Sequence, residues 1–289
     1  MRKGVRLIAV AALIIIICYM VRTKDKTKSI KDEKYIAINN DVEKLTDREE
    51  YLCGVLVHEV PVQYSKETIK TMAVIIRSYI AKKLYENGDK VVLSDKIGLP
   101  YVDLEKLKET LGEENYAENI EKYEEAVKDT TGEILLYNGK YVTPLYHYAS
   151  AGNTRNAKEV LGETYDYMSK KESNYDIEYP GFLNVEDCLS NEFNKTVIVE
   201  QSDDSGYVLS VSVDGEIMTG EQYAKRYGLN SSCFTVQYSD DNVRIITKGV
   251  GHGFGLSMYG ADKMSQKGAK YIDILNYYYD NLKLVKLKE

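Results

Sequence analysis

The pattern of apolar and polar positions predicts a buried helix in the stretch "YLCGVLVHEVP", residues 51–61. At about 100° per residue, Leu52, Val55 and Leu56 fall on one face of this helix. Glu59 follows Val55 by one helical turn and therefore lies on the same face. A carboxylate there costs free energy unless it has a partner, because burial disfavours its charged form. The pattern therefore raises the question of what Glu59 does.

A second buried helix follows in "KETIKTMAVIIRSYIAKKLYENG". Pro61 ends the helix that carries Glu59, and Ser65 is the expected N-cap of the next one. Apolar residues cover most sides of this second helix, which predicts that it is buried almost all round. Arg77 lies at the margin of the apolar stripe, where a lone cation needs a partner.

The rest of the chain alternates between short helices and hairpins. Turn signals at Asn138-Gly139 and Asp214-Gly215 predict β-hairpins, and Thr219 is expected to cap a short helix. The remaining expected elements are helices at about 103–110, 116–129 and 219–227, a hairpin within 233–249, and two helices from Ala261 to about Tyr279. Helices and hairpins are interspersed without βαβ alternation, so the predicted fold class is α+β.

The size and charge of the chain argue against one class of function, nucleic-acid binding. The chain has 289 residues with a formal net charge of −7, and its charges are mixed in sign. It has no long basic block, which argues against nucleic-acid binding, because neutralising phosphates requires a concentrated Lys/Arg surface.

The N-terminal region predicts a membrane anchor. A 15-residue apolar run, Leu7 to Val21, is bounded by Arg6 and Arg22. At 1.5 Å per residue it is about 22 Å long, and it spans a bilayer only if the arginines snorkel or the bilayer thins. The alternative is a cleaved signal peptide, but no small-x-small cleavage site follows the run. We therefore expect four regions: a short N-terminus at 1–5, an anchor at 6–22, a polar linker at 23–45, and the folded domain at 46–289. The basic residues on both sides of the anchor leave its orientation open.

The four cysteines do not suggest a metal site. Cys18 lies in the apolar run, and Cys53, Cys188 and Cys233 are widely spaced with no CxxC motif or compact histidine pairing. A disulfide between Cys188 and Cys233 and buried free thiols both remain open, and free thiols are the expected state.

Three segments carry candidate chemistry: the Glu59 helix, "YHYASAGNT" (146–154) and "GVGHGFGLSMYGA" (249–261). Glu59 has two interpretations. It is either a structural carboxylate paired with Arg77 or a general acid whose pKa is raised by apolar surroundings.

The glycine-rich third segment does not fit a phosphate-binding loop. Gly251, Gly253 and Gly255 resemble part of a dinucleotide fingerprint, but no buried parallel strand is expected before them. Closely spaced glycines more often allow two backbones to approach each other. Ser257 and His252 suggest a serine hydrolase only weakly, because no strand–turn–helix elbow surrounds the serine.

Together the three segments resemble one family. "LCGVLVHEVPVQYSKETIKTMAVIIRSYIAKK" looks like the N-terminal motif of the stage II sporulation protein D / LytB amidase-enhancer family. "ILLYNGKYVTPLYHYASAGNTRNAKEVLG" resembles its central motif, and "GVGHGFGLSMYGADKMSQKGAKYIDILNYYYDNLKL" resembles its C-terminal motif. The resemblance spans about residues 51–284, with the motifs in the family's order.

The resemblance implies a membrane-anchored peptidoglycan lytic transglycosylase that acts during endospore engulfment, with its catalytic domain outside the cytoplasm. Glu59 matches the family's catalytic acid. The implied partners are glycan strands and a sporulation amidase or endopeptidase similar to stage II sporulation protein P. The residues that we expect to line a substrate cleft are Arg77, His147, Ser150, Thr154, His252, Ser257 and Tyr259.

The sequence departs from the family pattern at several positions. His58 stands where relatives have a small residue, so it is interpreted as incidental. Asn153 replaces a common glycine, and Met258 replaces the usual glutamine. Some clostridial relatives bind zinc through Cys and His near the central motif, but no cysteine lies between Cys53 and Cys188 here. No metal or other cofactor is therefore expected.

Two other functions remain open on the sequence alone. The first is a non-catalytic module that binds peptidoglycan and enhances a partner amidase, as the LytB name implies. The second is a hydrolytic muramidase that uses Glu59 together with another acid.

Overall fold

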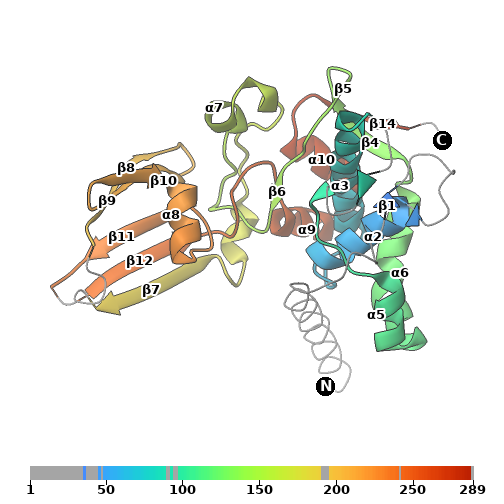
Figure 1. Ribbon diagram of the computed structural model, residues 1–289, viewed down its shortest axis with the longest axis horizontal. Helices are drawn as coiled ribbons and strands as arrows, with labels where there is room; N and C mark the ends of the chain where they lie inside the picture. The colour runs from blue at the N-terminus through green and yellow to red at the C-terminus, as the bar shows by residue number, and fades with distance from the viewer. Residues whose placement is uncertain are drawn as a thin grey trace. The chain divides into compact units, whose positions relative to one another are not determined.

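The structure, a computed structural model, describes residues 35–36, 45–46, 48–88, 92–93, 97–189, 195–240 and 242–287. It divides into two compact units, residues 1–135 with 284–289 and residues 136–283, and each is described by itself (Figure 1). The predicted anchor at 6–22 lies outside the described residues. Within the described ranges, no helix combines the length and the hydrophobicity that crossing a membrane requires.

The described residues of the first unit form mainly four helices. They are α2 (Arg48–Glu59), α3 (Lys66–Glu86), α5 (Leu104–Leu111) and α6 (Glu113–Asp129). A small sheet has the order β2-β1-β3, formed by β1 (Tyr35–Ile36), β2 (Leu45–Thr46) and β3 (Val92–Leu93).

Helices α2, α3 and α6 pack against one another. The predicted N-cap of α3 is present, because the Ser65 side chain accepts a hydrogen bond from the Thr68 N–H. Helix α3 is buried on most of its surface, as the sequence predicted. The largest fully buried apolar side chains of α2 and α3 include Leu52, Leu56 and Ile69.

Gly54 allows another segment to approach α2 closely. The Val102 N–H donates to the Gly54 carbonyl at 3.0 Å. A Cβ atom on Gly54 would collide with the Val102 carbonyl oxygen and would also touch the Tyr101 ring. The glycine in the middle of α2 is therefore required by packing, not by helix propensity.

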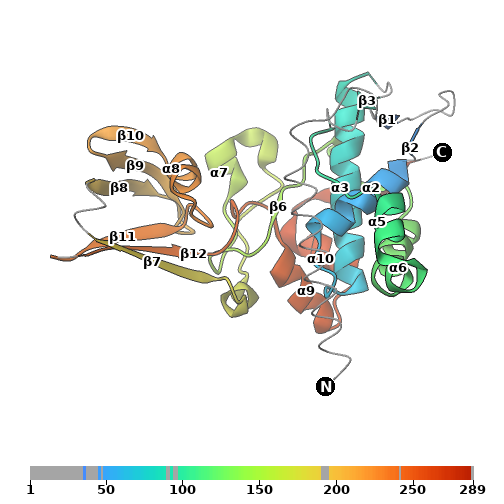
Figure 2. The ribbon, with the colours of Figure 1, turned by 60° about the horizontal axis from the view of Figure 1, so that its bottom comes forward.

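The second unit contains a β-sandwich. Its two sheets have the orders β10-β9-β8 and β11-β12-β7, and Figure 2 shows them face to face. The elements are β7 (Leu183–Leu189), β8 (Val197–Ser202), β9 (Val208–Val213), β10 (Glu216–Thr219), α8 (Gly220–Tyr227), β11 (Phe234–Tyr238) and β12 (Asn242–Lys248).

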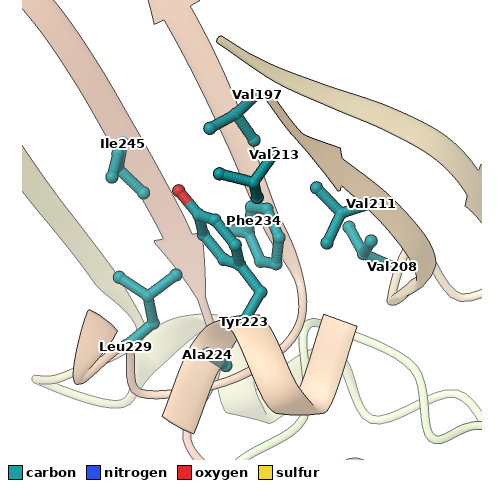
Figure 3. Close-up of a cluster of buried hydrophobic side chains, with 9 residues drawn as sticks. All are labelled: Val197, Val208, Val211, Val213, Tyr223, Ala224, Leu229, Phe234 and Ile245. Atoms are coloured by element: carbon teal, nitrogen blue, oxygen red, sulfur yellow. The ribbon is translucent and has the colours of Figure 1, made fainter. Parts of the chain in front are cut away.

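An aromatic pair fills the core of the sandwich. The ring of Tyr223, from α8, stacks on Phe234 with centroids 4.7 Å apart (Figure 3). Valines from β8 and β9 and Ile245 from β12 surround this pair. Helix α8 starts with the predicted cap, because the Thr219 side chain accepts from the Gln222 N–H and the Gln222 side chain reaches back to the Thr219 N–H.

The rest of the second unit brings the central and C-terminal motifs together. Its elements are β5 (Lys140–Tyr141), β6 (Tyr146–His147), α7 (Ala157–Leu161), two short 3-10 helices (Glu163–Tyr165 and Asn174–Glu178), β13 (Leu256–Ser257), α9 (Met258–Gln266) and α10 (Tyr271–Tyr278). Strands β4 (Glu133–Tyr137) and β14 (Leu282–Lys286) contain the points at which the chain passes between the units. The central and C-terminal motifs meet where β6 pairs with β13 in parallel.

The α+β class is confirmed, and two local expectations are wrong. The sequence suggested antiparallel hairpins only, but β6 and β13 form a parallel pair between distant segments. The last two helices do not begin at Ala261, because the Ser257 side chain accepts from the Gly260 N–H and starts α9 at Met258. Both hairpin turns are confirmed: Asn138, Gly139, Asp214 and Gly215 all have positive φ angles.

Gly54→Ala should destabilise the protein even though alanine favours helix formation by about 1 kcal/mol. The collision with the Val102 carbonyl outweighs this gain, because overpacking costs about 1–3 kcal/mol. Urea unfolding of the variant against wild type measures the difference. Lys82→Ala, at a partly exposed position of α3, is the control and should change stability little. An increase in stability for Gly54→Ala would contradict the close approach.

Candidate functional site

Glu59 is the last residue of α2, and 18% of its side chain is exposed. The apolar face that precedes it is confirmed, since Leu52, Val55 and Leu56 are completely buried. The backbone after Glu59 is fixed by a bond from the Val60 N–H to the Leu56 carbonyl and by one from the Tyr123 hydroxyl to the Val60 carbonyl. The carboxylate is therefore held at the edge of the core on a rigid support.

His58 contacts the Glu59 carboxylate, with Nδ1 and Oε1 3.1 Å apart. Both side chains are about one-fifth exposed. His58 was interpreted as incidental because relatives have a small residue at this position, and adjacent positions of a helix do not normally face each other. At the end of α2 the two side chains nevertheless meet.

Arg77 does not pair with Glu59. Its guanidinium forms a two-pronged ion pair with Glu49 at the start of α2, with the shortest distance 2.7 Å from Nη2 to Oε2. The remaining donors bond the Thr130 hydroxyl and the carbonyls of Val127 and Glu133. Because Arg77 is 1% exposed and every donor is occupied, the structural interpretation of this arginine is favoured over substrate binding.

His147 and His252 form a contact pair in the second unit, with ring centroids 5.8 Å apart. The Nδ1–H of His147 donates to the Phe254 carbonyl, and its Nε2 is buried without a partner among the described residues. The Nδ1 atom of His252 accepts from the Phe254 N–H, so its proton is on Nε2. Burial lowers the pKa of His147 to about 3 and that of His252 to about 4, so both rings are neutral near pH 7.

A buried carboxylate that the sequence did not single out, Asp176, connects the central and C-terminal motifs. One of its oxygens accepts from the Ser150 N–H at 2.7 Å and from the Ser150 hydroxyl at 2.6 Å. The other accepts from the Ser257 hydroxyl at 2.7 Å. Burial raises the pKa of Asp176, and the serine hydrogen bonds oppose that rise.

The hydroxyl groups expected to bind substrate are mostly engaged inside the protein. Ser150, Thr154 and Ser257 are completely buried. The Thr154 hydroxyl accepts from the Lys171 N–H at 2.8 Å. Tyr259 is half-buried, and its hydroxyl donates to the Glu178 carbonyl at 3.1 Å. A substrate-binding role for the three buried residues stays a prediction that this arrangement does not favour.

Arg155 is a second important residue that the sequence did not single out. Its side chain is completely buried, with Nε 2.5 Å from Asp203 and Nη1 2.5 Å from Glu221. Nη1 also donates to the His252 carbonyl at 3.2 Å. The guanidinium lies over the rings of Phe254 and Tyr207, with centroids 4.3 and 4.8 Å away. These contacts link the chain around His252 to the sandwich. The sequence signal for Arg155 was its place inside the central motif.

The glycines of "GVGHGFG" serve close backbone approach, as the sequence suggested. All four have positive φ angles. A Cβ on Gly251 would lie 2.8 Å from the His147 Cβ, and one on Gly253 would lie 2.5 Å from the Tyr207 ring. A Cβ on Gly255 would collide with the Leu145 carbonyl. No phosphate-binding geometry is needed to explain this loop.

No group of three or more potential ligand residues that could hold a metal ion occurs in the described part of the chain. Cys53, Cys188 and Cys233 are free thiols, and Cys53 and Cys233 are buried. Glu59 and Arg77 belong to the first unit, and the other expected residues belong to the second. Their convergence on one cleft therefore stays a prediction.

Comparison with known proteins confirms the family resemblance. Residues 34–137, which include Glu59 and Arg77, match the family model SpoIID, stage II sporulation protein. This segment is therefore similar to the SpoIID domain. Along most of its length it is similar to stage II sporulation protein D of Bacillus amyloliquefaciens, with 28% identity over 86% of this chain and 76% of the relative.

Two further relatives extend the comparison. Stage II sporulation protein D of Bacillus subtilis (strain 168) is 26% identical over 90% of this chain and 80% of its own length. The amidase enhancer of the same strain is 23% identical over 79% of this chain but only 39% of its own length.

Arg77→Ala should lower the free energy of unfolding by about 3 kcal/mol, the lower end of the range for breaking a buried ion pair, because Glu49 keeps some contact with solvent. Arg244→Ala is the matched control, since its pair with Asp187 is about half-exposed and contributes at most about 1 kcal/mol. Chemical denaturation measures both. Unchanged stability together with lost glycan binding would instead assign Arg77 to the substrate.

The buried histidines should make the protein less stable in mild acid. As pH falls below the ordinary histidine pKa of 6.5, the unfolded chain takes up protons that the folded chain accepts only near pH 4 and pH 3. Stability is therefore full above pH 6.5 and falls on acidification by up to about 1.4 kcal/mol per pH unit for each histidine.

Urea unfolding between pH 7 and pH 5 measures this effect. His147→Phe removes one titrating group and should give a shallower pH dependence than wild type. Equal slopes for the two proteins would mean that His147 is charged or solvated in the folded state.

Proposed function

We propose that this protein is a peptidoglycan lytic transglycosylase that cleaves the bond between N-acetylmuramic acid and N-acetylglucosamine during endospore engulfment. The observation that carries the proposal is Glu59, a partly exposed carboxylate fixed at the end of a buried helix inside the segment that matches the SpoIID family. Two relatives are named stage II sporulation protein D, which supports a role in sporulation.

Glu59 performs both proton transfers in this mechanism. Its protonated carboxyl gives a proton to the glycosidic oxygen as the bond to the muramic C1 breaks. The resulting carboxylate then takes the proton of the muramic C6 hydroxyl, whose oxygen bonds to C1 and closes a 1,6-anhydro ring. One carboxylate suffices, because the nucleophile is part of the substrate. Glycoside hydrolases, in contrast, use two carboxyl groups.

His58 is suited to assist this cycle. An imidazole Nδ1 accepts a hydrogen bond from a protonated carboxyl and donates one to a carboxylate, depending on the tautomer. A contact at 3.1 Å therefore remains favourable in both states of Glu59 and restricts the rotation of its side chain. A rigid acid is placed more consistently against the scissile bond.

A second candidate function is a non-catalytic module that binds glycan strands and stimulates a partner amidase. The similarity to an amidase enhancer favours it, although this chain covers 39% of that relative. In either function, the partners that we propose are glycan strands and a cell-wall amidase or endopeptidase similar to stage II sporulation protein P.

Glu59→Gln should reduce glycan cleavage at least about 100-fold while leaving the thermal unfolding midpoint unchanged, because glutamine keeps the shape but delivers no proton. Glu86→Gln, at the exposed end of α3, is the control and should retain full activity. Cleavage of purified glycan strands by each protein measures the effect. Normal release of fragments by Glu59→Gln would eliminate Glu59 as the acid.

Mass spectrometry of the same digests separates the candidate functions. Anhydro-muramic ends support the lytic reaction, and reducing ends indicate a hydrolytic muramidase. Strands that stay intact with wild-type protein, together with faster release of stem peptides by an added amidase, indicate the enhancer.

We further propose that the apolar run Leu7 to Val21 anchors the protein with its folded domain outside the cytoplasm. The expected linker at 23–45 includes Tyr35–Ile36, which pair with β2 and β3 in the first unit, so only the residues between Val21 and Tyr35 are proposed as a tether. The full-length protein should remain with membranes after a high-salt wash and require detergent for release. Recovery of a soluble form that starts shortly after Val21 would indicate a cleaved signal peptide instead.

A further inference from the structure

Glu59 lies at the end of α2, where the helix is least able to hold it. Pro61 has no N–H, so it cannot donate the hydrogen bond to the Val57 carbonyl that would continue the helix. The Val60 N–H still donates to the Leu56 carbonyl, at 2.9 Å. Helix ends fray unless groups outside the helix satisfy them. A carboxyl group that has to meet a particular bond of its substrate therefore needs support from another element.

Helix α6, which packs against α2, supplies this support. The Tyr123 hydroxyl donates to the Val60 carbonyl at 2.8 Å. The neighbouring residue of α6, Lys122, donates from Nζ to the Tyr64 carbonyl at 3.3 Å. The turn between these two carbonyls is closed by a bond of 3.0 Å from the Tyr64 N–H to the Pro61 carbonyl. Two consecutive residues of α6 thus hold both ends of the turn that follows the acid.

Burial makes the bond from Tyr123 the more important of the two. Tyr123 is 1% exposed and Val60 is 2% exposed. A buried carbonyl that loses its donor is destabilised unless another donor replaces it. Removing the Tyr123 hydroxyl therefore favours a movement of the Val60 peptide, and Glu59 precedes Val60 directly in the chain. Lys122 is only partly buried, so water can replace its bond.

We propose that Tyr123 is a positioning residue for Glu59. Its hydroxyl fixes the end of α2, so that the carboxyl group meets the glycosidic oxygen and the C6 hydroxyl in one orientation. The inference rests on the proposed function, in which Glu59 makes both proton transfers. Tyr123 acts through the Val60 backbone, and helix α6 thereby contributes to the reaction without carrying a catalytic group.

Tyr123→Phe in the full-length protein, purified in detergent, tests this role, because phenylalanine keeps the ring and removes only the hydroxyl. The variant should show a kcat for glycan cleavage about 10-fold below that of wild type with little change in KM, since a misplacement of about 1 Å can cost about 100-fold in rate. A kcat equal to that of wild type would overturn the proposal.

Tyr116→Phe is the matched control. Tyr116 is also buried and lies two helical turns before Tyr123 on the same face of α6. Its hydroxyl donates to Glu124 of the same helix, at 2.7 Å, and not to the turn after Glu59. The control should retain the wild-type kcat even where its thermal unfolding midpoint falls. An equal loss of kcat in both variants would mean that the loss reflects general destabilisation, which contradicts a positioning role.

A double-mutant cycle shows whether Tyr123 acts through Glu59. In a Glu59→Gln background, Tyr123→Phe should cause no further loss of the residual cleavage rate, because two residues that act as a unit have non-additive effects. A further loss as large as that in the wild-type background would overturn the proposal, since the hydroxyl would then act independently of the acid.

Hydrogen exchange gives a readout that does not depend on cleavage. Mass spectrometry of peptides covering residues 52–64 should show faster amide exchange in Tyr123→Phe than in wild type or Tyr116→Phe, because the end of α2 opens more often. Unchanged exchange would show that Tyr123 does not hold this end. A wild-type protein that leaves glycan strands intact would instead refute the proposed function and the catalytic part of this inference, and exchange alone then decides whether Tyr123 fixes α2.

Discussion

A single buried carboxylate, Asp176, determines how the second unit is assembled. A carboxylate that is completely buried is tolerated only when hydrogen bonds replace its lost solvation. The bonds come from Ser150 in the central motif and Ser257 in the C-terminal motif, so satisfying Asp176 requires that these distant segments lie together. Ser257 also caps α9 and pairs with His147 in the parallel pair of β6 and β13. The serines that look chemically reactive in the sequence thus serve the fold.

The arrangement of the second unit also depends on the close approach of the glycine-rich loop around His252 to neighbouring segments. The loop around His252 fits because its glycines leave no side chain where Leu145, His147 and Tyr207 lie. Arg155 then ties the His252 carbonyl to Asp203 and Glu221 and places its guanidinium over two aromatic rings. Removing one member of this buried network leaves its partners without their hydrogen bonds. The chain segments that carry Arg155, Asp203, Glu221 and His252 are therefore expected to fold cooperatively.

Much of the local structure could be predicted from the sequence, because it depends on neighbouring residues. Ser65, Thr219 and the Asn-Gly and Asp-Gly turns each act within a few positions of the chain, and all were predicted correctly. The fully buried face before Glu59 follows from helical periodicity alone. The β6–β13 pair, the partner of Arg77 and the role of Asp176 could not be predicted, since each joins residues far apart in sequence. Strand β7 was missed because its exposed odd-numbered side chains are apolar, the reverse of a half-buried strand.

The hydrogen bonds and ion pairs of the acidic side chains in the second unit bear on whether a hydrolytic mechanism is possible. A hydrolytic mechanism requires a second carboxyl group besides Glu59. In the second unit, four acidic side chains are already bound: Asp176 by serines, Asp203 and Glu221 by Arg155, and Asp280 by Lys171 and Ser169. Each of these hydrogen bonds or ion pairs would have to break before the carboxylate could activate water. The lytic reaction needs no second carboxylate, because the C6 hydroxyl of the substrate is its nucleophile. The engagement of these four carboxylates is consistent with the proposed lytic reaction, in which Glu59 is the only acid.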